Sequence, residues 1–553
     1  MNSLIVAIFA VLLLGWGFKF YGKIMEKLWD VNPDRKTPAL EMTDGVDYIP
    51  AKHWTILFGH HFASIAGAGP IIGPVIAIAI WGWFPALLWI LIGSIFMGGV
   101  HDFSCLMGSI RHKGKSISDV AGSTMGHRAK MLFGTFLWLS LVLVVAVFAA
   151  VTSTTLVNEP RIVIPTFGLI LVAILTGLMI YKWKVNRVVA TVIGLALLGS
   201  LLVLGYYYPI SLRLKGSTEI WIAVLLVYSF IASITPVNIL LQPRDYLSSF
   251  ILFFGLILGY MGLFFSHPSM HTPAFIKWSG GQGNLWPMLF VIIACGAISG
   301  FHSLIASGTT SKQLANERDA KKVAYGGMLL EGAVAVIALV AVASGLYWTG
   351  GAGREGLVYP ELIKGGNWIG TFAIGFGQIV APLIGATFGS LVAMVMLNSF
   401  VMTTLDTATR VNRYITGELL GEGLKWKIFQ NRYFSTAVVI FFAGYLAFGN
   451  WKAIWPIFGA SNQLVAALAL VVVTIYLWAM KKPTKYTIYP GIFVLLTTTG
   501  ALIYQVGGFI VDRNYLLAII GLILLILAVF MVREGIIVVQ KVKKAKKPLG
   551  MSF

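Results

Sequence analysis

The chain has 553 residues, of which 58% are hydrophobic and 11% are charged. This composition excludes a soluble or a disordered protein and is typical of a polytopic membrane protein. The net charge of +20 does not require a nucleic-acid partner, because its distribution has a simpler explanation in the topology that follows.

Apolar stretches long enough to cross a hydrocarbon core of ~30 Å recur along the whole chain. We expect one all-α transmembrane domain, residues 1–553, in which 1–20 and 487–540 are peripheral. The stretches predict about 15 transmembrane helices: residues 3–20, 60–80, 84–108, 131–157, 163–181, 188–208, 219–239, 247–266, 287–307, 323–348, 382–408, 434–450, 452–480, 487–506 and 514–532. Segment 368–381 is too short to span, and we expect it to lie in the interface or to re-enter.

The loops of this topology alternate between basic and nearly uncharged. Most of the 41 Lys and Arg residues fall in the loops on one side, which the positive-inside rule places in the cytoplasm. The first apolar run has its basic residues after it rather than before it, as in a retained anchor. We therefore predict a multi-pass protein of the cell (inner) membrane, with its N-terminus outside and its C-terminus cytoplasmic.

The second span opens with two histidines and is then interrupted, in FGHHFASIAGAGPIIGP at residues 58–74. Within a helix, glycine costs about 1 kcal/mol and proline about 3 kcal/mol, and backbone groups freed in lipid find no water. This span is therefore expected to line a cavity, where the opened backbone can contact a solute. The predicted substrate contacts here are Ser64, Gly67, Ala68 and Gly69.

A second span has the same character, in ACGAISGFHSLIASGTTSK at residues 294–312. The topology threads 60–80 and 287–307 in opposite directions, and paired interrupted spans indicate the binding site of a secondary transporter. The repeats would cover roughly 60–266 and 287–480. Ser299, Gly300 and Ser303 are the predicted substrate contacts of this half. Close packing of small residues between helices is the alternative explanation.

Several ionisable residues fall inside spans, where each costs at least ~2.5 kcal/mol and is a functional candidate. Histidine and carboxylate groups that titrate near neutrality are suited to a proton relay. We predict that His61, His302, Glu331 and Asp102 handle protons. Asp406 and Arg410 are four residues apart, which favours a structural ion pair on one helix.

Two cation-binding alternatives use overlapping residues. His60, His61, His101 and Asp102 could supply ligands to Zn²⁺, in a zinc-binding protein or an intramembrane metalloenzyme. Thr403, Thr404 and Thr407 could supply oxygens to Na⁺, in a sodium-coupled carrier, or could bond back to their own helix. No HExxH or paired CxxC spacing is present, so we expect no catalytic residues, no required cofactor and no enzyme. A passive channel or sensor is a further alternative.

Three motifs are similar to signatures of the carbon starvation protein A family: GHHFASIAGAGPIIGP at 59–74, GGVHDF at 98–103 and LLQPRDYLSS at 240–249. This resemblance implies a bacterial inner-membrane transporter, either of peptides during carbon starvation or of pyruvate with protons. It also implies a relationship to the amino acid–polyamine–organocation superfamily, with a LeuT-like core of five-plus-five inverted repeats. The broken first and sixth helices of that core would be 60–80 and 287–307.

The mechanism that these patterns predict is alternating access by a proton-coupled carrier. The carboxylate of a small solute would bind where the half-helix N-termini meet. Arg244, next to Asp245 at the cytoplasmic boundary, is expected to be an inner-gate or structural pair. The sequence does not choose between peptide, pyruvate and amino acid, and it leaves the oligomeric state open.

Overall fold

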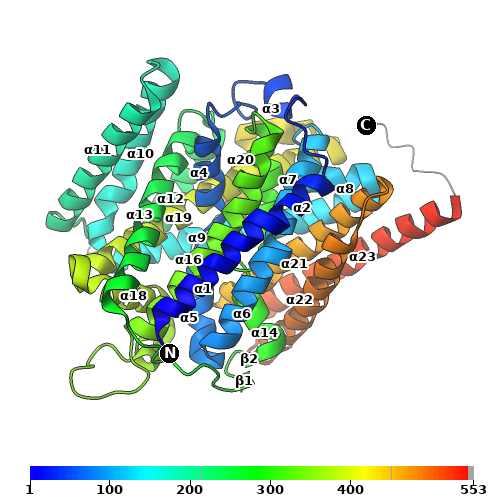
Figure 1. The fold of residues 1–553 in the computed structure, drawn as a ribbon. Helices are drawn as coiled ribbons and strands as arrows, with labels where there is room; N and C mark the ends of the chain where they lie inside the picture. Colours follow the sequence, from blue (N-terminus) through cyan, green and yellow to red (C-terminus); the bar gives the residue numbers. More distant parts are fainter. Residues whose placement is uncertain (213, 450, 546–553) are drawn as a thin grey trace.

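The computed structural model describes residues 1–212, 214–449 and 451–545. This part of the chain forms a bundle of long helices that run between two faces (Figure 1). We call the face on which α1 begins the N-terminal face, and the opposite one, on which α23 ends, the C-terminal face. The only strands described are the short antiparallel pair β1 (Ser279–Gly280) and β2 (Gly283–Asn284) at the N-terminal face.

Thirteen helical segments of the described residues are long and apolar enough to cross a membrane, which confirms a polytopic all-α protein. They are α1 (Ser3–Trp16) with α2 (Gly22–Leu28), α4 (Trp54–Ile65) with α5 (Gly69–Trp81), α6 (Trp83–Gly93) with α7 (Gly99–Arg111), α9 (His127–Asn158), α10 (Val163–Gly177), α11 (Arg187–Tyr207), α12 (Ser217–Ile234), α13 (Leu241–Ser266), α16 (Gly326–Gly345), α19 (Ala386–Thr416), α21 (Trp451–Ala479), α22 (Lys485–Val511) and α23 (Tyr515–Ala545). All thirteen coincide with predicted spans.

The two other predicted spans have different forms. The span expected at 287–307 is divided into α14 (Leu285–Ile292) and α15 (Gly300–Gly308). The span expected at 434–450 is α20 (Arg432–Ala447), which has only 16 residues.

The predicted boundary at residue 382 is wrong. Helix α18 (Trp368–Ile384) includes that residue, and Gly385 separates it from α19. Gly385 has a φ of +76°, which side chains rarely tolerate, so the chain turns there. The middle of α18 packs against the ends of α13 and α16 near the N-terminal face (Figure 1): a Cβ at Gly262 would lie 2.8 Å from the carbonyl of Ile379.

Short helical pieces complete the described chain. Three are α-helical: α3 (Pro38–Glu41), α8 (Ile117–Met125) and α17 (Tyr359–Leu362). Short π-helical turns cover Gly17–Tyr21, Ser94–Gly98, Leu178–Lys182, Lys321–Tyr325 and Gly417–Gly423. Short 3₁₀ turns cover Pro160–Ile162, Thr310–Lys312, Glu317–Asp319, Lys364–Gly366 and Lys427–Gln430.

One large hydrophobic core runs through the bundle, and the broken helices lie within it. The pair α10 and α11 stands at the edge of the molecule (Figure 1) and forms small apolar clusters of its own. The pair packs against α13 through one of these clusters. The buried charged residues and histidines of the spans lie on α4, α7, α13, α15, α16 and α19, which position the site.

Candidate functional site

Both spans that the sequence marks as interrupted are broken in the structure. Helix α4 ends at Ile65 and α5 begins at Gly69, while α14 ends at Ile292 and α15 begins at Gly300. The glycines and prolines that break the helices lie in buried surroundings, where opened backbone is tolerated. The expected discontinuous helices are confirmed.

The two broken helices meet each other. Helix α4 packs against α15, and α5 packs against α14, so the first half of each broken helix contacts the second half of the other. This pairing requires that they run in opposite directions. A Cβ at Gly69 would overlap Cys295, and one at Gly73 would lie 2.5 Å from the carbonyl oxygen of Ile292. Glycine is needed at both places because the two backbone segments are too close to each other for a side chain to fit between them.

The seven predicted substrate contacts are all buried around these breaks: Ser64, Gly67, Ala68, Gly69, Ser299, Gly300 and Ser303. Their polar groups differ in whether they already have hydrogen-bond partners within the protein. A Cβ at Gly67 would lie 3.0 Å from the Thr404 hydroxyl and 3.1 Å from the Phe148 ring, so this break faces α19 and α9. The hydroxyl of Ser303 instead donates to the carbonyl of Gly300, 2.6 Å away on its own helix.

Asn462 of α21 caps the N-terminus of α15. Its Oδ1 accepts a hydrogen bond from the Phe301 amide at 2.7 Å. Its Nδ2 donates to the hydroxyl of Ser299 at 2.9 Å and lies 3.4 Å from the sulfur of Cys295. Sequence reasoning missed this residue, although the polar run SNQ at 461–463 inside an apolar span was an available signal.

Three of the four predicted proton-handling residues form one buried cluster. Nδ1 of His302 is 2.9 Å from Asp102 Oδ2, and its Nε2 is 3.0 Å from Glu331 Oε2. The first contact is a hydrogen bond, whereas the second has ion-pair distance without hydrogen-bond alignment. His101 joins the cluster through Nδ1, 2.9 Å from Asp102 Oδ1. We call these four residues the His302 centre.

Within the described residues, His61 makes no hydrogen bond to the His302 centre. Its Nδ1 is 2.8 Å from the Thr310 hydroxyl. A Cβ at Gly327 of α16 would lie 3.1 Å from the His61 ring. The proton-handling role of His61 stays a prediction.

The His302 centre is short of positive charge. It has two carboxylates and two imidazoles, and all four side chains are fully buried. With neutral imidazoles its formal charge is −2, and unbalanced charge in a low-dielectric interior is costly. The arrangement therefore favours bound protons, which is the chemistry that proton coupling requires.

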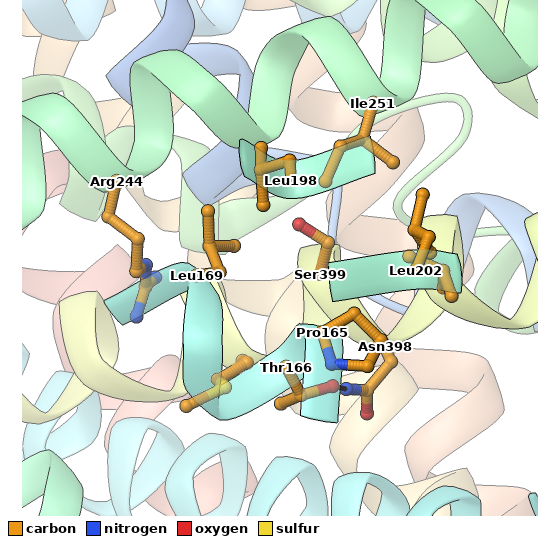
Figure 2. Close-up of a pocket in the computed structure, with 11 residues that line it drawn as sticks. Pro165, Thr166, Leu169, Leu198, Leu202, Arg244, Ile251, Asn398 and Ser399 are labelled. Atoms are coloured by element: carbon orange, nitrogen blue, oxygen red, sulfur yellow. Dashed lines mark hydrogen bonds between the residues drawn. The ribbon is translucent and has the colours of Figure 1, made fainter. Parts of the chain in front are cut away.

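A second buried cluster surrounds Arg244, which contacts both Asp406 and Asp245. Its Nη2 is 3.2 Å from Asp406 Oδ1 and 3.1 Å from Asp245 Oδ1, and its Nη1 also donates to Asp406. Tyr228 donates to Asp406 at 2.8 Å, and His60 Nδ1 is 2.6 Å from Asp245 Oδ2. Arg244 also borders a cavity of about 20 Å³ between α10, α11, α13 and α19 (Figure 2).

The predicted ion pair of Asp406 with Arg410 is wrong. Asp406 points toward α13 and pairs with Arg244. Arg410 donates to Asp47 at 2.7 Å and to the carbonyl of Ala232 at the end of α12. The four-residue spacing on one helix made the pair possible, but each of the two side chains binds a partner from another part of the chain instead.

The predicted cation-site threonines lie on α19 next to the end of α4. The hydroxyl of Thr404 donates to the carbonyl of Ser64 at 2.9 Å, and the hydroxyl of Thr407 is 3.2 Å from that of Ser64. Among the described residues, Thr403 bonds only back to the carbonyl of Ser399 on its own helix, and Thr404 also bonds back to the carbonyl of Phe400 at 3.0 Å. Two of the three threonines are thus brought to the first break, and Thr403 is not.

The four candidate zinc ligands, His60, His61, His101 and Asp102, are not gathered around one point. His60 and His61 turn to different partners, while His101 and Asp102 pair with each other. Within the described residues, no group of three or more His, Cys, Asp and Glu side chains could hold a metal ion.

Ion pairs at the C-terminal face connect the loop before α4, residues 42–53, to α19. Asp47 of this loop accepts hydrogen bonds from Arg410 at 2.7 Å and from Arg413 at 3.0 Å. Burial would raise the pKa of Asp47, but the two guanidinium groups outweigh that effect and lower it to about 2.

We expect Asp47→Asn to destabilise the protein by about 2.5 kcal/mol, because each unit by which the pKa is lowered stabilises the folded state by about 1.4 kcal/mol. The stabilisation is fully present above the unfolded-state pKa of about 4 and is lost as the pH falls through about 2. The difference in melting temperature between wild type and variant should therefore be constant from pH 5 to 8 and shrink below pH 4. A difference that changes between pH 5 and 8 would contradict this assignment.

Comparison with known proteins gives similarity along nearly the whole chain. Residues 2–349 and 361–501 match the family model described as carbon starvation protein CstA. The pyruvate/proton symporter BtsT of Escherichia coli (strain K12) is 34% identical, over 88% of this chain and 79% of that protein. The peptide transporter CstA of Campylobacter jejuni is 32% identical, over 90% of this chain and 79% of that protein.

A solved structure extends the similarity to the fold. The manganese transporter of Eremococcus coleocola, in complex with an aromatic bis-isothiourea substituted compound, superposes with a TM-score of 0.56. The alignment covers 91% of this chain and 99% of that one, at 12% sequence identity. At this identity the match shows a shared fold alone.

Proposed function

This chain belongs to the carbon starvation protein CstA family, and we propose that it is a proton-coupled carrier of small carboxylate-bearing nutrients such as pyruvate or short peptides. Its curated relatives are named as transporters, so it is a transporter and not an enzyme. Its proposed place is the bacterial inner membrane, with the C-terminal face in the cytoplasm, and its proposed role is nutrient uptake during carbon starvation.

The observation that carries the proposal is the meeting of two oppositely directed broken helices inside the bundle. The N-terminus of α15 has amide groups that attract a carboxylate. In this conformation the Phe301 amide is bonded to Asn462. A solute carboxylate would take the place of Asn462 Oδ1, beside the Ser299 hydroxyl that Asn462 also contacts.

Protons would enter through the His302 centre. His302 lies on α15, whereas His101 and Asp102 are on α7 and Glu331 is on α16. The cluster therefore ties the second broken helix to two neighbouring helices, and its charge changes with each proton bound or released. Loading protons lowers the cost of closing this buried region. This links protonation to the change between inward-facing and outward-facing states.

A sodium-coupled carrier is the second candidate. It is favoured by the oxygen atoms of Ser64, Thr404 and Thr407, which converge where α4 ends. Hard cations such as Na⁺ prefer oxygen ligands. Replacing sodium with choline in the uptake assay separates the two, because only the sodium mechanism would lose uptake.

Uptake into proteoliposomes tests both the function and the substrate class. With an inward proton gradient, we expect accumulation of pyruvate or of a dipeptide. Pyruvate with one proton moves no net charge, so clamping the membrane potential should not change its accumulation. A zwitterionic dipeptide with one proton moves one positive charge, and a potential of −100 mV should raise its accumulation about 50-fold.

The matched control is liposomes that contain no protein, under the same gradients. Absence of uptake of pyruvate, amino acids and dipeptides under proton and sodium gradients would contradict the proposed function. Uptake that neither saturates nor responds to a proton gradient would instead indicate a passive channel.

A further inference from the structure

The cluster around Arg244 has the properties of a binding site in its own right. It joins five side chains from four helices, His60, Tyr228, Arg244, Asp245 and Asp406, which we call the His60 centre. His60, Asp245 and Asp406 are fully buried, and Arg244 is only 1% exposed. His60 makes two hydrogen bonds, from Nδ1 to Asp245 at 2.6 Å and from Nε2 to the hydroxyl of Thr309 at 3.0 Å.

The charges of this centre do not balance unless it binds a proton. Arg244 carries one positive charge, and Asp245 and Asp406 carry two negative charges. With a neutral His60 the formal sum is −1. A charge buried without compensation is strongly unfavourable in a low-dielectric interior. One proton on the His60–Asp245 pair makes the centre neutral and turns their contact into a charge-assisted hydrogen bond.

The His60 centre is separate from the His302 centre. His60 and His61 follow each other on α4, so their side chains leave the helix in different directions. His60 contacts Thr309 and Asp245, whereas His61 contacts Thr310. The charged residues of the His60 centre lie on α13 and α19, and those of the His302 centre lie on α7 and α16.

A small cavity, lined mostly by apolar side chains, borders the centre at Arg244. It has a volume of about 20 Å³, which is room for one water molecule, and Arg244 lies at its edge (Figure 2). Asn398 and Ser399 also line it. Asn398 Oδ1 and Ser399 Oγ are buried and have no hydrogen-bond partner within the described residues. These two atoms and the guanidinium group are the polar groups in the cavity lining that a water molecule there can contact.

We propose that the His60 centre is a second proton-binding site, which holds one proton on the His60–Asp245 pair in this conformation. Proton binding at this site follows from burial, geometry and charge, and does not depend on the transported solute. Its participation in coupling rests on the proposed transport function, and would mean that each cycle moves protons at two separate sites.

Stability of the purified full-length protein tests the charge argument. His60→Gln removes the proton-binding ring and leaves the centre at −1, so its melting temperature should fall by several degrees. Asp245→Asn removes the negative charge and should have a smaller effect. The double variant H60Q/D245N is neutral without a proton, so it should be more stable than H60Q alone. His61→Gln, at an equally buried neighbouring histidine, is the matched control and should not be rescued by D245N.

Infrared spectra of the same variants follow the proton directly. If the proton moves to a carboxylate in H60Q, this variant should show a carboxylic-acid C=O band and lose only a little stability. The band should then be absent from H60Q/D245N. That result also supports the site. Wild-type stability of H60Q without such a band would overturn the proposal, and so would a destabilised H60Q that D245N does not rescue. These readouts need no transport, so their failure is distinct from failure of the carrier function.

Discussion

Glu331→Gln should abolish proton-driven solute accumulation, with a loss of at least about 100-fold, while the protein still folds. Glutamine keeps the size of glutamate but cannot ionise, so the His302 centre loses one of its two negative charges. His302 then has only Asp102 to balance its charged form. Accumulation into proteoliposomes under a proton gradient measures the loss, and exchange of labelled for unlabelled solute without a gradient should persist.

Two controls make this prediction specific. Glu361→Gln changes an exposed glutamate of α17 and should accumulate solute as the wild type does. Asp102→Asn, at the other carboxylate of the centre, should resemble Glu331→Gln. Normal proton-driven accumulation by Glu331→Gln would assign Glu331 a structural role and would remove the main support for coupling at this centre.

Gly69→Ala should eliminate uptake and lower the melting temperature. The added methyl group would overlap the Cβ and Sγ of Cys295 at the point where the two breaks touch. Overpacking of a filled interior costs about 1 to 3 kcal/mol and often more where backbone must shift. A bulkier residue such as leucine should be worse. Uptake, binding and thermal unfolding of the purified variant measure the effect.

A compensating change tests the contact itself. Cys295→Gly removes both overlapping atoms, so the double variant G69A/C295G should regain at least part of the uptake and stability lost in G69A. Gly199→Ala is the control, since a Cβ at Gly199 in α11 meets nothing within 4 Å. Equal damage in G69A and the double variant would mean that the two breaks do not depend on each other.

The sequence was sufficient for most of the fold because its signals were local. Apolar stretches of spanning length located the membrane helices, and the glycines and prolines at 67–74 predicted the first break directly. The end of α18 was missed because Pro382 lies inside that helix, whereas the turn occurs at Gly385. Proline weakens a helix without always ending it, so it marks boundaries only approximately.

The contacts within the site were less predictable, because its side chains bind partners that lie far away in the sequence. His302, Asp102 and Glu331 could be predicted together, since each is an ionisable residue inside a span. The partner of Asp406 could not, because Arg244 is 162 positions away and Arg410 offered a nearer pairing. Asn462 required knowledge that α21 packs against the start of α15.

In the proposed binding mode, the solute carboxylate replaces the side-chain oxygen of Asn462 as the hydrogen-bond acceptor of the Phe301 amide. The affinity expected for a solute is then the difference between two competing interactions with Phe301. A weakly bound cargo is also released readily on the far side. With no solute bound, the Phe301 amide still has a hydrogen-bond acceptor in Asn462 Oδ1, so the empty protein leaves no unpaired donor at this position inside the bundle.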